Sequence, residues 1–120
     1  LHDITLENNE LAEVKTVSEL DQKRSQFTEK EISDYMEHPV LAAEMAKKMT
    51  EVPPDVDTII RQHHERPDGT GFPRKLNHTY IAPLSAVFII AHDLADYTLQ
   101  EKGKVQNIEG FIETLKAQYK

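Results

Sequence analysis

The chain has 120 residues, the length of one domain, and its 38% hydrophobic and 29% charged residues are typical of a globular protein in water. Its 14 Lys and Arg against 21 Asp and Glu leave a formal net charge of −7, which argues against a protein that binds the DNA or RNA backbone. The absence of cysteine excludes disulfides and thiolate metal ligands and fits a cytoplasmic location, and no apolar run reaches the ~18 to 20 residues of a membrane span.

The first part of the chain predicts little regular structure. Residues 1–6 begin without Met and have the pattern of the end of an element, so we expect further elements upstream of this chain. Residues 7–26 are polar, and we expect a mobile loop with helical character there. The apolar residues that permit a weak helix or two short turns are spaced three apart: Leu11, Val14, Val17 and Leu20.

The clearest start of a helix is Thr28 followed by Glu31, which has the form of a capping box. Helical spacing continues to Pro39, where we expect a break or a fresh first turn. Beyond it the helix continues toward Pro53. Its predicted apolar face consists of His38, Leu41, Ala42, Met45 and Met49.

The next predicted helix spans residues 55–65, with Asp55 as a plausible N-cap. His63 and His64 continue the apolar stripe of this helix, so both imidazoles are expected to face inward. A rigid, turn-rich loop over residues 67–73 follows.

Two more helices complete the pattern, and no segment is typical of a strand. The first covers residues 83–99, and Ile89, Asp93 and Asp96 share one of its faces. The second is amphipathic and covers residues 108–119. Its inward residues are predicted to be Ile108, Phe111, Ile112 and Leu115. The sequence thus predicts an all-α helical bundle with an additional C-terminal helix.

Histidine and aspartate recur at inward-facing or element-ending positions in four separate parts of the chain. These residues are His2, Asp3, His38, His63, His64 and Asp93. Imidazole and carboxylate ligands without thiolate suit Fe, Mn or Zn. A buried ionised Asp needs a cation or hydrogen-bonded partners, and a metal site would meet that need. Asp3 beside His2 could bridge two cations that hold a hydroxide for attack on a phosphodiester.

Simpler interpretations stand beside the metal site. A single inward His is more often a hydrogen-bonded core residue than a ligand, and for His38 alone that interpretation is favoured. His78 lies in a polar loop and is expected at the surface. His92 points about 100° away from Asp93 on a helix, so a surface position, or one beside the ligands, is favoured over direct ligation.

At three places the sequence resembles a known family. The pair His2-Asp3 resembles the His-Asp doublet of the HD superfamily of metal-dependent phosphohydrolases. Residues 63–73 resemble the long HHExxDGxGYP signature of its HD-GYP subfamily, and residues 91–96 resemble the downstream AxDxxD element. The family is all-α and hydrolyses the bacterial messenger cyclic di-GMP at a centre of two or three metal ions, often iron.

The resemblance implies that residues 1–120 are an HD-GYP-like domain without its upstream helices. It implies two or three divalent ions, most often Fe, with Mn or Zn as alternatives. The implied metal ligands are His2, Asp3, His38, His63, His64 and Asp93, with Asp3 as the bridge. Asp3 and Asp96 are the implied catalytic residues. The positions implied to contact the substrate or to fix the loop are Glu65, Asp68, Gly69, Gly71, Phe72 and Arg74.

The chain also departs from the family pattern. Leu6 stands where the family has a Lys that meets phosphate, Phe72 replaces the signature Tyr, and no Arg-rich stretch follows Asp96. Each lost charged contact could remove ~1.5–3 kcal/mol of phosphate binding. The basic residues near the expected site are predicted to be solvated rather than to replace those contacts. They are Arg61, Arg66, Arg74 and Lys75.

Three functions are therefore compared. The first is a metal-dependent phosphodiesterase that acts on cyclic di-GMP, with a bridging hydroxide attacking phosphorus. The second is a catalytically degenerate, metal-binding signalling module, which binds a cyclic dinucleotide without hydrolysis or docks to a diguanylate cyclase through the loop around Phe72. The third is a helical bundle without metal. The first is favoured.

Overall fold

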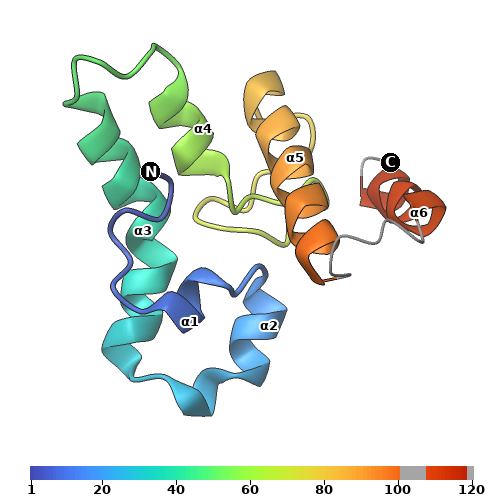
Figure 1. Cartoon of the computed structure of the whole chain (residues 1–120), viewed down its shortest axis with the longest axis horizontal. Coiled ribbons are helices and arrows are strands. Elements are labelled where there is room, and N and C mark those ends of the chain that lie inside the picture. The colour runs from blue at the N-terminus through green and yellow to red at the C-terminus, as the bar shows by residue number, and fades with distance from the viewer. Residues whose placement is uncertain (101–107, 119–120) are drawn as a thin grey trace.

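The computed structural model describes residues 1–100 and 108–118, and it shows how the helices are arranged (Figure 1). Within these ranges the chain contains helices and loops but no strand, apart from an isolated bridge between Asp68 and Asn77. The prediction of an all-α fold is confirmed. No helix within the described ranges is long and apolar enough to cross a membrane.

Residues 7–26 have the expected helical character, in the form of two short helices and a 3-10 turn. The side chains of Asn8 and Thr16 accept backbone hydrogen bonds and cap the first two of these helices. The elements are α1 (Asn9–Ala12), α2 (Val17–Gln22) and the 3-10 turn η1 (Arg24–Gln26). The residues that bury their side chains here are Leu11, Val14 and Leu20, three of the four apolar residues with three-residue spacing.

The longest helix, α3 (Glu29–Lys47), begins at the predicted capping box. Thr28 Oγ1 accepts from the backbone N–H of Glu31 at 3.2 Å, and the Glu31 carboxylate accepts from the N–H of Thr28 at 2.8 Å. The expected break at Pro39 is wrong, because Pro39 lies inside a continuous helix. A proline at this position leaves the carbonyl of Tyr35, four residues earlier, without its helical donor.

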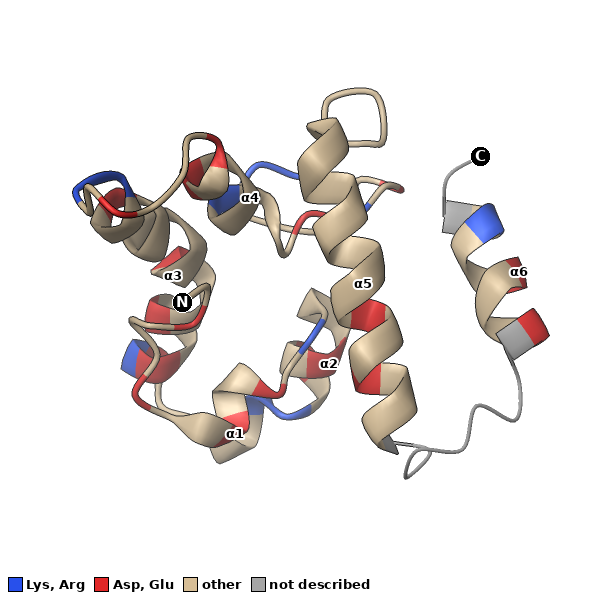
Figure 2. Ribbon diagram, turned by 45° about the horizontal axis from the view of Figure 1, so that its top comes forward, with Lys and Arg blue, Asp and Glu red and all other residues tan. Residues whose placement is uncertain are grey.

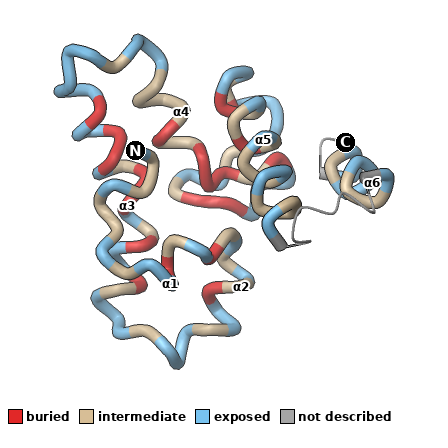
Figure 3. The backbone as a smooth tube through the Cα atoms, viewed as in Figure 1, coloured by how far each residue is buried: buried red, intermediate tan, exposed pale blue. Residues whose placement is uncertain are grey.

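Of the predicted apolar face, His38 and Ala42 are buried as expected, whereas its larger apolar residues are not. Leu41, Met45 and Met49 are exposed, with 46%, 41% and 38% of their surface accessible. The buried residues are Ile32, Tyr35, His38, Pro39, Ala42, Ala43 and Ala46. The reason is the partner helix, because small alanines allow close packing of backbones while Leu and Met on the same face would hold them apart. Buried residues concentrate in α3 and in the segment that follows α4 (Figure 3).

Helix α4 (Val56–Gln62) packs against α3 and is shorter than predicted. Its apolar contact is Ile60, which joins the α3 alanines in a small core. Asp55 precedes the helix with φ of 75° and makes no side-chain capping bond. Because the helix ends at residue 62, His63 and His64 lie on the first turn beyond it, and both are buried.

Helix α5 (Pro83–Gln100) follows the long loop, and α6 (Ile108–Gln118) lies to one side of it (Figure 1). The charged residues of α5 are Asp93 and Asp96, in its second half (Figure 2). Tyr97 of α5 contacts Phe111 of α6, with ring centres 5.4 Å apart. Ile112 was predicted to face inward and is 41% exposed instead. The side chain of residue 108 and the predicted helix end at 119 fall outside the described residues.

A second, larger core lies between α1, α2 and α3 and reaches the loop after α4. Its buried members are Leu11, Val14, Leu20, Ile32, Tyr35 and Phe72. The Tyr35 hydroxyl donates to the carbonyl of Val14 at 2.6 Å, which satisfies the polar end of a fully buried ring. This core positions Tyr35 and Phe72 directly beside the buried histidines.

Candidate metal centre

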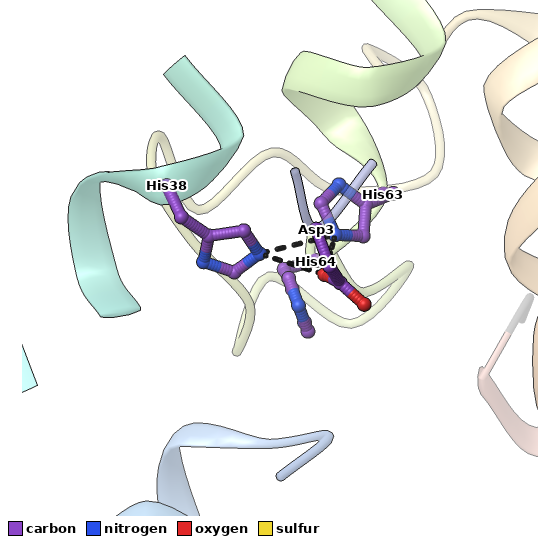
Figure 4. A group of neighbouring side chains, drawn as sticks. All are labelled: Asp3, His38, His63 and His64. Atoms are coloured by element: carbon purple, nitrogen blue, oxygen red, sulfur yellow. Dashed lines mark hydrogen bonds and ion pairs between the residues drawn. The ribbon is translucent and has the colours of Figure 1, made fainter. Parts of the chain in front are cut away.

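Four of the predicted ligands come together in space (Figure 4). Each of them offers a ligand atom, and these atoms all lie within 4.8 Å of one another. Three elements supply them: the N-terminal segment, the middle of α3, and the turn after α4. The four residues are Asp3, His38, His63 and His64, and we call them the candidate metal centre.

The carboxylate of Asp3 faces two sides of this centre. Its Oδ1 lies 3.3 Å from Nε2 of His38 and 3.6 Å from Nε2 of His63. Its Oδ2 lies 3.1 Å from Nε2 of His2. One oxygen therefore meets the buried histidines and the other meets His2, an arrangement suited to a carboxylate that bridges two cations.

The ring orientation of His38 and His63 is set by backbone carbonyls. Nδ1 of His38 bonds the carbonyl of Tyr35, the acceptor that Pro39 leaves free. Nδ1 of His63 bonds the carbonyl of Ile60 at 2.5 Å, in the last turn of α4, where this carbonyl also accepts from the backbone N–H of His63 at 3.4 Å. In each ring Nδ1 is thus the donor and Nε2 is left to bind a cation.

His64 is held by its aromatic neighbours. Its ring stacks on Phe72 with centres 4.6 Å apart and an interplanar angle of 14°, and Tyr35 touches it edge-on. Its Nδ1 is buried and has no hydrogen-bond partner. An unpaired buried nitrogen is costly, and a bound metal ion would satisfy it.

The protonation states suit a cation site. Burial lowers the pKa of His64 well below its usual value, and the nearby His63 and His38 lower it further. Burial also lowers the pKa of His63. Burial raises the pKa of Asp3, but the imidazoles of His2, His38 and His63 beside its carboxylate outweigh burial and hold that pKa well below its ordinary range. Neutral imidazoles and an ionised carboxylate are the forms that ligate metals, so the residues fit a divalent ion such as Zn, Fe or Mn.

The structure does not bring Asp93 into the centre. Its Oδ2 lies 2.7 Å from Nη1 of Arg66, and both side chains are nearly buried. Nη2 of Arg66 donates to the carbonyl of Lys15 at 3.3 Å, so the arginine ties α5 to two loops. Arg66 was expected to be solvated, and the ion pair shows otherwise. Asp93 as a ligand stays a prediction.

Asp96, the predicted catalytic residue, also has partners of its own. Its Oδ2 lies 3.6 Å from Nζ of Lys15 and 3.2 Å from Nδ1 of His92. It lies one turn beyond Asp93 on α5, and its catalytic role stays a prediction. The other basic residues of the expected cluster differ in their environment. Arg61 pairs with Glu44 at 3.1 Å, while Arg74 and Lys75 are exposed.

The loop after His64 is held in place by Glu65. This carboxylate is 1% exposed and accepts from the backbone N–H groups of Arg74 and Leu76, both at 2.8 Å. At the tip of the loop Asp68 accepts from the N–H and hydroxyl of Thr70. The loop therefore has a buried anionic anchor under the residues that follow the His pair.

Two glycines of the loop are required for different physical reasons, one steric and one conformational. A Cβ on Gly71 would lie 2.3 Å from the carbonyl oxygen of His64 and 2.4 Å from the N of Arg66, so the backbone passes too closely for a side chain. Gly69 has φ of +81°, a conformation that favours glycine. Phe72 follows with 2% exposure, so its ring belongs to the core.

Sequence reasoning missed the role of Tyr35. Its ring touches His38, His64 and Phe72, and its carbonyl orients His38. Tyr35 lies one helical turn before His38, and Pro39 follows His38 directly. This spacing was the sequence signal that could have indicated the role of Tyr35. His78 is exposed, as expected.

An all-α fold around clustered histidines and an aspartate defines a class of metal-binding helical protein. A family profile for the HD domain matches residues 15–114, most of the chain, and the chain belongs to this family. HD domains bind divalent metals and are generally metal-dependent hydrolases. The matched region contains His38, His63 and His64, and His2-Asp3 lies before it. No curated protein and no solved structure matches the chain.

Proposed function

We propose that this HD domain is a phosphodiesterase that holds two divalent ions and hydrolyses cyclic di-GMP. The observation that carries the proposal is the two-sided carboxylate of Asp3, with Oδ1 toward His38 and His63 and Oδ2 toward His2. Three imidazoles and a bridging carboxylate without thiolate are the donor set of hydrolytic metal centres. The resemblance of residues 63–73 to the HD-GYP signature supports cyclic di-GMP as the substrate.

In this proposal the protein residues have distinct tasks. His38, His63 and His64 would hold one ion together with Asp3, and His2 would hold the other with the same carboxylate. Such ions supply an activated water and stabilise the charge that develops on the phosphoryl oxygens. The backbone carbonyls behind His38 and His63 keep both rings in one tautomer.

Phosphate binding would fall to Lys15 and Arg66, since Leu6 offers no charge. Both line a cavity of about 340 Å³ beside Asp93, which Asp68 and Tyr97 also line. A cationic side chain that changes partner from carboxylate to phosphate keeps a charge-assisted hydrogen bond.

The second candidate is a signalling module that binds cyclic di-GMP without hydrolysis. The pairing of Arg66 with Asp93 and of Lys15 with Asp96 favours it, because both cations are already neutralised within the fold. A diguanylate cyclase docked at the loop would contact its exposed residues, such as Thr70 and Arg74, because Phe72 is buried. Cytoplasmic location and the identity of the metal stay predictions.

One assay separates the candidates. The 120-residue chain is loaded with Fe(II) or Mn(II) under anaerobic conditions, its metal content is measured, and it is incubated with cyclic di-GMP. Linear dinucleotide or GMP supports the enzyme. Saturable binding of cyclic di-GMP without product at full metal occupancy supports the signalling module. A chain that retains no metal refutes both.

A further inference from the structure

We propose that His92 is an additional metal ligand, which shares an ion with His2 on the Oδ2 side of Asp3. This inference rests on the proposed function, because it adds a ligand to that centre. His92 lies on α5, and its side chain is 32% exposed, so an ion can reach it from solvent. The opposite side of the centre, around His38, is fully buried.

The rings of His2 and His92 lie close together. The centres of the His2 and His92 rings are 5.1 Å apart, with planes at 89°. Two imidazoles on one ion, with N–metal bonds of about 2.1 Å and ligand angles of roughly 90–110°, have ring centres about 4.5–5.2 Å apart. Within the candidate metal centre the corresponding separations are 5.1 Å for His38–His63 and 4.9 Å for His38–His64. The pair of His2 and His92 therefore has the spacing of two ligands on one ion.

The ring of His92 is oriented by a carboxylate on its own helix. Nδ1 of His92 lies 3.2 Å from Oδ2 of Asp96, one helical turn further on α5. A carboxylate that accepts from Nδ1 leaves Nε2 as the free nitrogen, and ligating histidines are commonly oriented in this way. His38 and His63 have the same arrangement, with backbone carbonyls in place of the carboxylate.

The Oδ2 side of Asp3 has few other ligands among the described residues. His2 lies beside Oδ2 of Asp3. Asp93, the other predicted ligand, instead pairs with Arg66 at 2.7 Å. A catalytic metal site takes three protein ligands and keeps one position open. Asp3, His2 and His92 complete that number without breaking the buried ion pair of Arg66.

Phe88 supports this arrangement. It lies one turn before His92 on α5, and its ring touches His2 at 5.4 Å and His92 at 5.8 Å between centres. It also reaches the ring of His63 at 6.4 Å. An apolar ring beside three imidazoles restricts their motion and limits water at the ligand nitrogens, which strengthens their electrostatic interactions.

The test compares two substitutions of His92 with a matched control. His92→Phe keeps an aromatic ring against His2 and Phe88 but removes the ligand nitrogens, and His92→Ala removes both. His78→Phe makes the same chemical change at an exposed histidine outside the centre. Each 120-residue chain is titrated with Co(II) against a competing chelator, and the number of bound ions and their affinities are measured. Circular dichroism and the unfolding midpoint of the metal-free proteins report folding.

We expect the wild-type chain to bind two Co(II) ions, and both His92 variants to bind one of them at least tenfold more weakly while the other is unchanged. The His92→Phe protein should also lose one hyperfine-shifted imidazole N–H signal in the NMR spectrum of the Co(II) form. His78→Phe should match the wild type. If the wild type binds two ions and both His92 variants retain them with wild-type affinity, the ligand role is wrong and the proposed function stands. If the wild type binds no ion, both are refuted.

Discussion

The imidazole of His38 bonds the carbonyl of Tyr35 through Nδ1, and this carbonyl is available because Pro39 has no N–H to give it. A residue usually regarded as a helix breaker thus orients a candidate metal ligand. The helix loses one backbone hydrogen bond, and the side chain of the preceding residue replaces it.

Substitution Pro39→Ala should weaken metal binding. The new backbone N–H at position 39 would bond the carbonyl of Tyr35 and displace His38 Nδ1, which frees the ring to rotate. Loss of such an orienting partner costs about 10–100-fold in metal affinity. Competition between the protein and a chelator for Co(II) measures the affinity. Pro54→Ala is the control, because Pro54 is exposed. Equal affinities in the two variants would contradict the orienting role.

Substitution Asp3→Ala should remove both ions together, because it deletes the carboxylate whose two oxygens face His38 and His2. Metal analysis after dialysis should find less than half an equivalent, whereas loss of a ligand to a single ion would leave about one. The control is Asp34→Ala, an exposed carboxylate paired with Lys30. Full metal stoichiometry in Asp3→Ala would exclude a bridge.

The two loop glycines should respond differently to alanine. Gly71→Ala places a Cβ 2.3 Å from the carbonyl oxygen of His64, so the backbone must move, at a cost of about 1–3 kcal/mol and with reduced metal content. Gly69→Ala meets nothing closer than 3.7 Å and costs about 1–2 kcal/mol for its positive φ, with metal content retained. Urea unfolding and metal analysis measure both. A metal loss shared by the two variants would mean that the loop acts only as a whole.

Substitution Glu65→Gln should destabilise the chain by about 1.5–3 kcal/mol, because one of the two carboxylate oxygens that accept backbone N–H groups becomes a donor. Urea unfolding of the metal-free protein gives the free energy. Glu44→Gln, at an exposed ion pair with Arg61, should stay within about 0.5 kcal/mol of wild type. A Glu65→Gln protein as stable as wild type would show that the anchor is dispensable.

The metal-free chain should lose stability as the pH falls below about 6.5, the usual pKa of histidine. Burial lowers the pKa of His63 and His64 in the folded state, so the unfolded chain binds more protons in this range and is favoured. Each such histidine contributes a slope of up to about 1.4 kcal/mol per pH unit. Urea unfolding between pH 7.5 and 5.0 measures the slope, which His64→Phe should reduce. A flat profile in the wild type would show that both rings are protonated in the folded state.

Local patterns were sufficient for the start of α3 and for the burial of His63 and His64. The capping box at Thr28 needs only the side chains of residues 28 and 31, and the burial of both histidines follows from the apolar stripe that leads to them. Residues 63–73 resemble a long signature that spans the turn-rich loop. Each of these features lies within a few residues of sequence.

Features that depend on distant partners could not be predicted in this way. The buried face of α3 is determined by the approach of α4, which selects Ala43 and Ala46 over Leu41 and Met45. The Asp93–Arg66 ion pair joins residues 27 positions apart, and the contact of His92 with His2 spans most of the chain. The helical angle between His92 and Asp93 indicates the direction of the His92 side chain, but it does not indicate which residue that side chain contacts.

The residues of the candidate metal centre lie between Asp3 and His64, on three separate elements. An ion bound there would act as a removable cross-link that is present only in the folded chain. Its binding energy would then add to the folding free energy. The supply of metal in its surroundings would therefore set the fraction of chains in which the N-terminal segment, through Asp3, is held against His38 and His63.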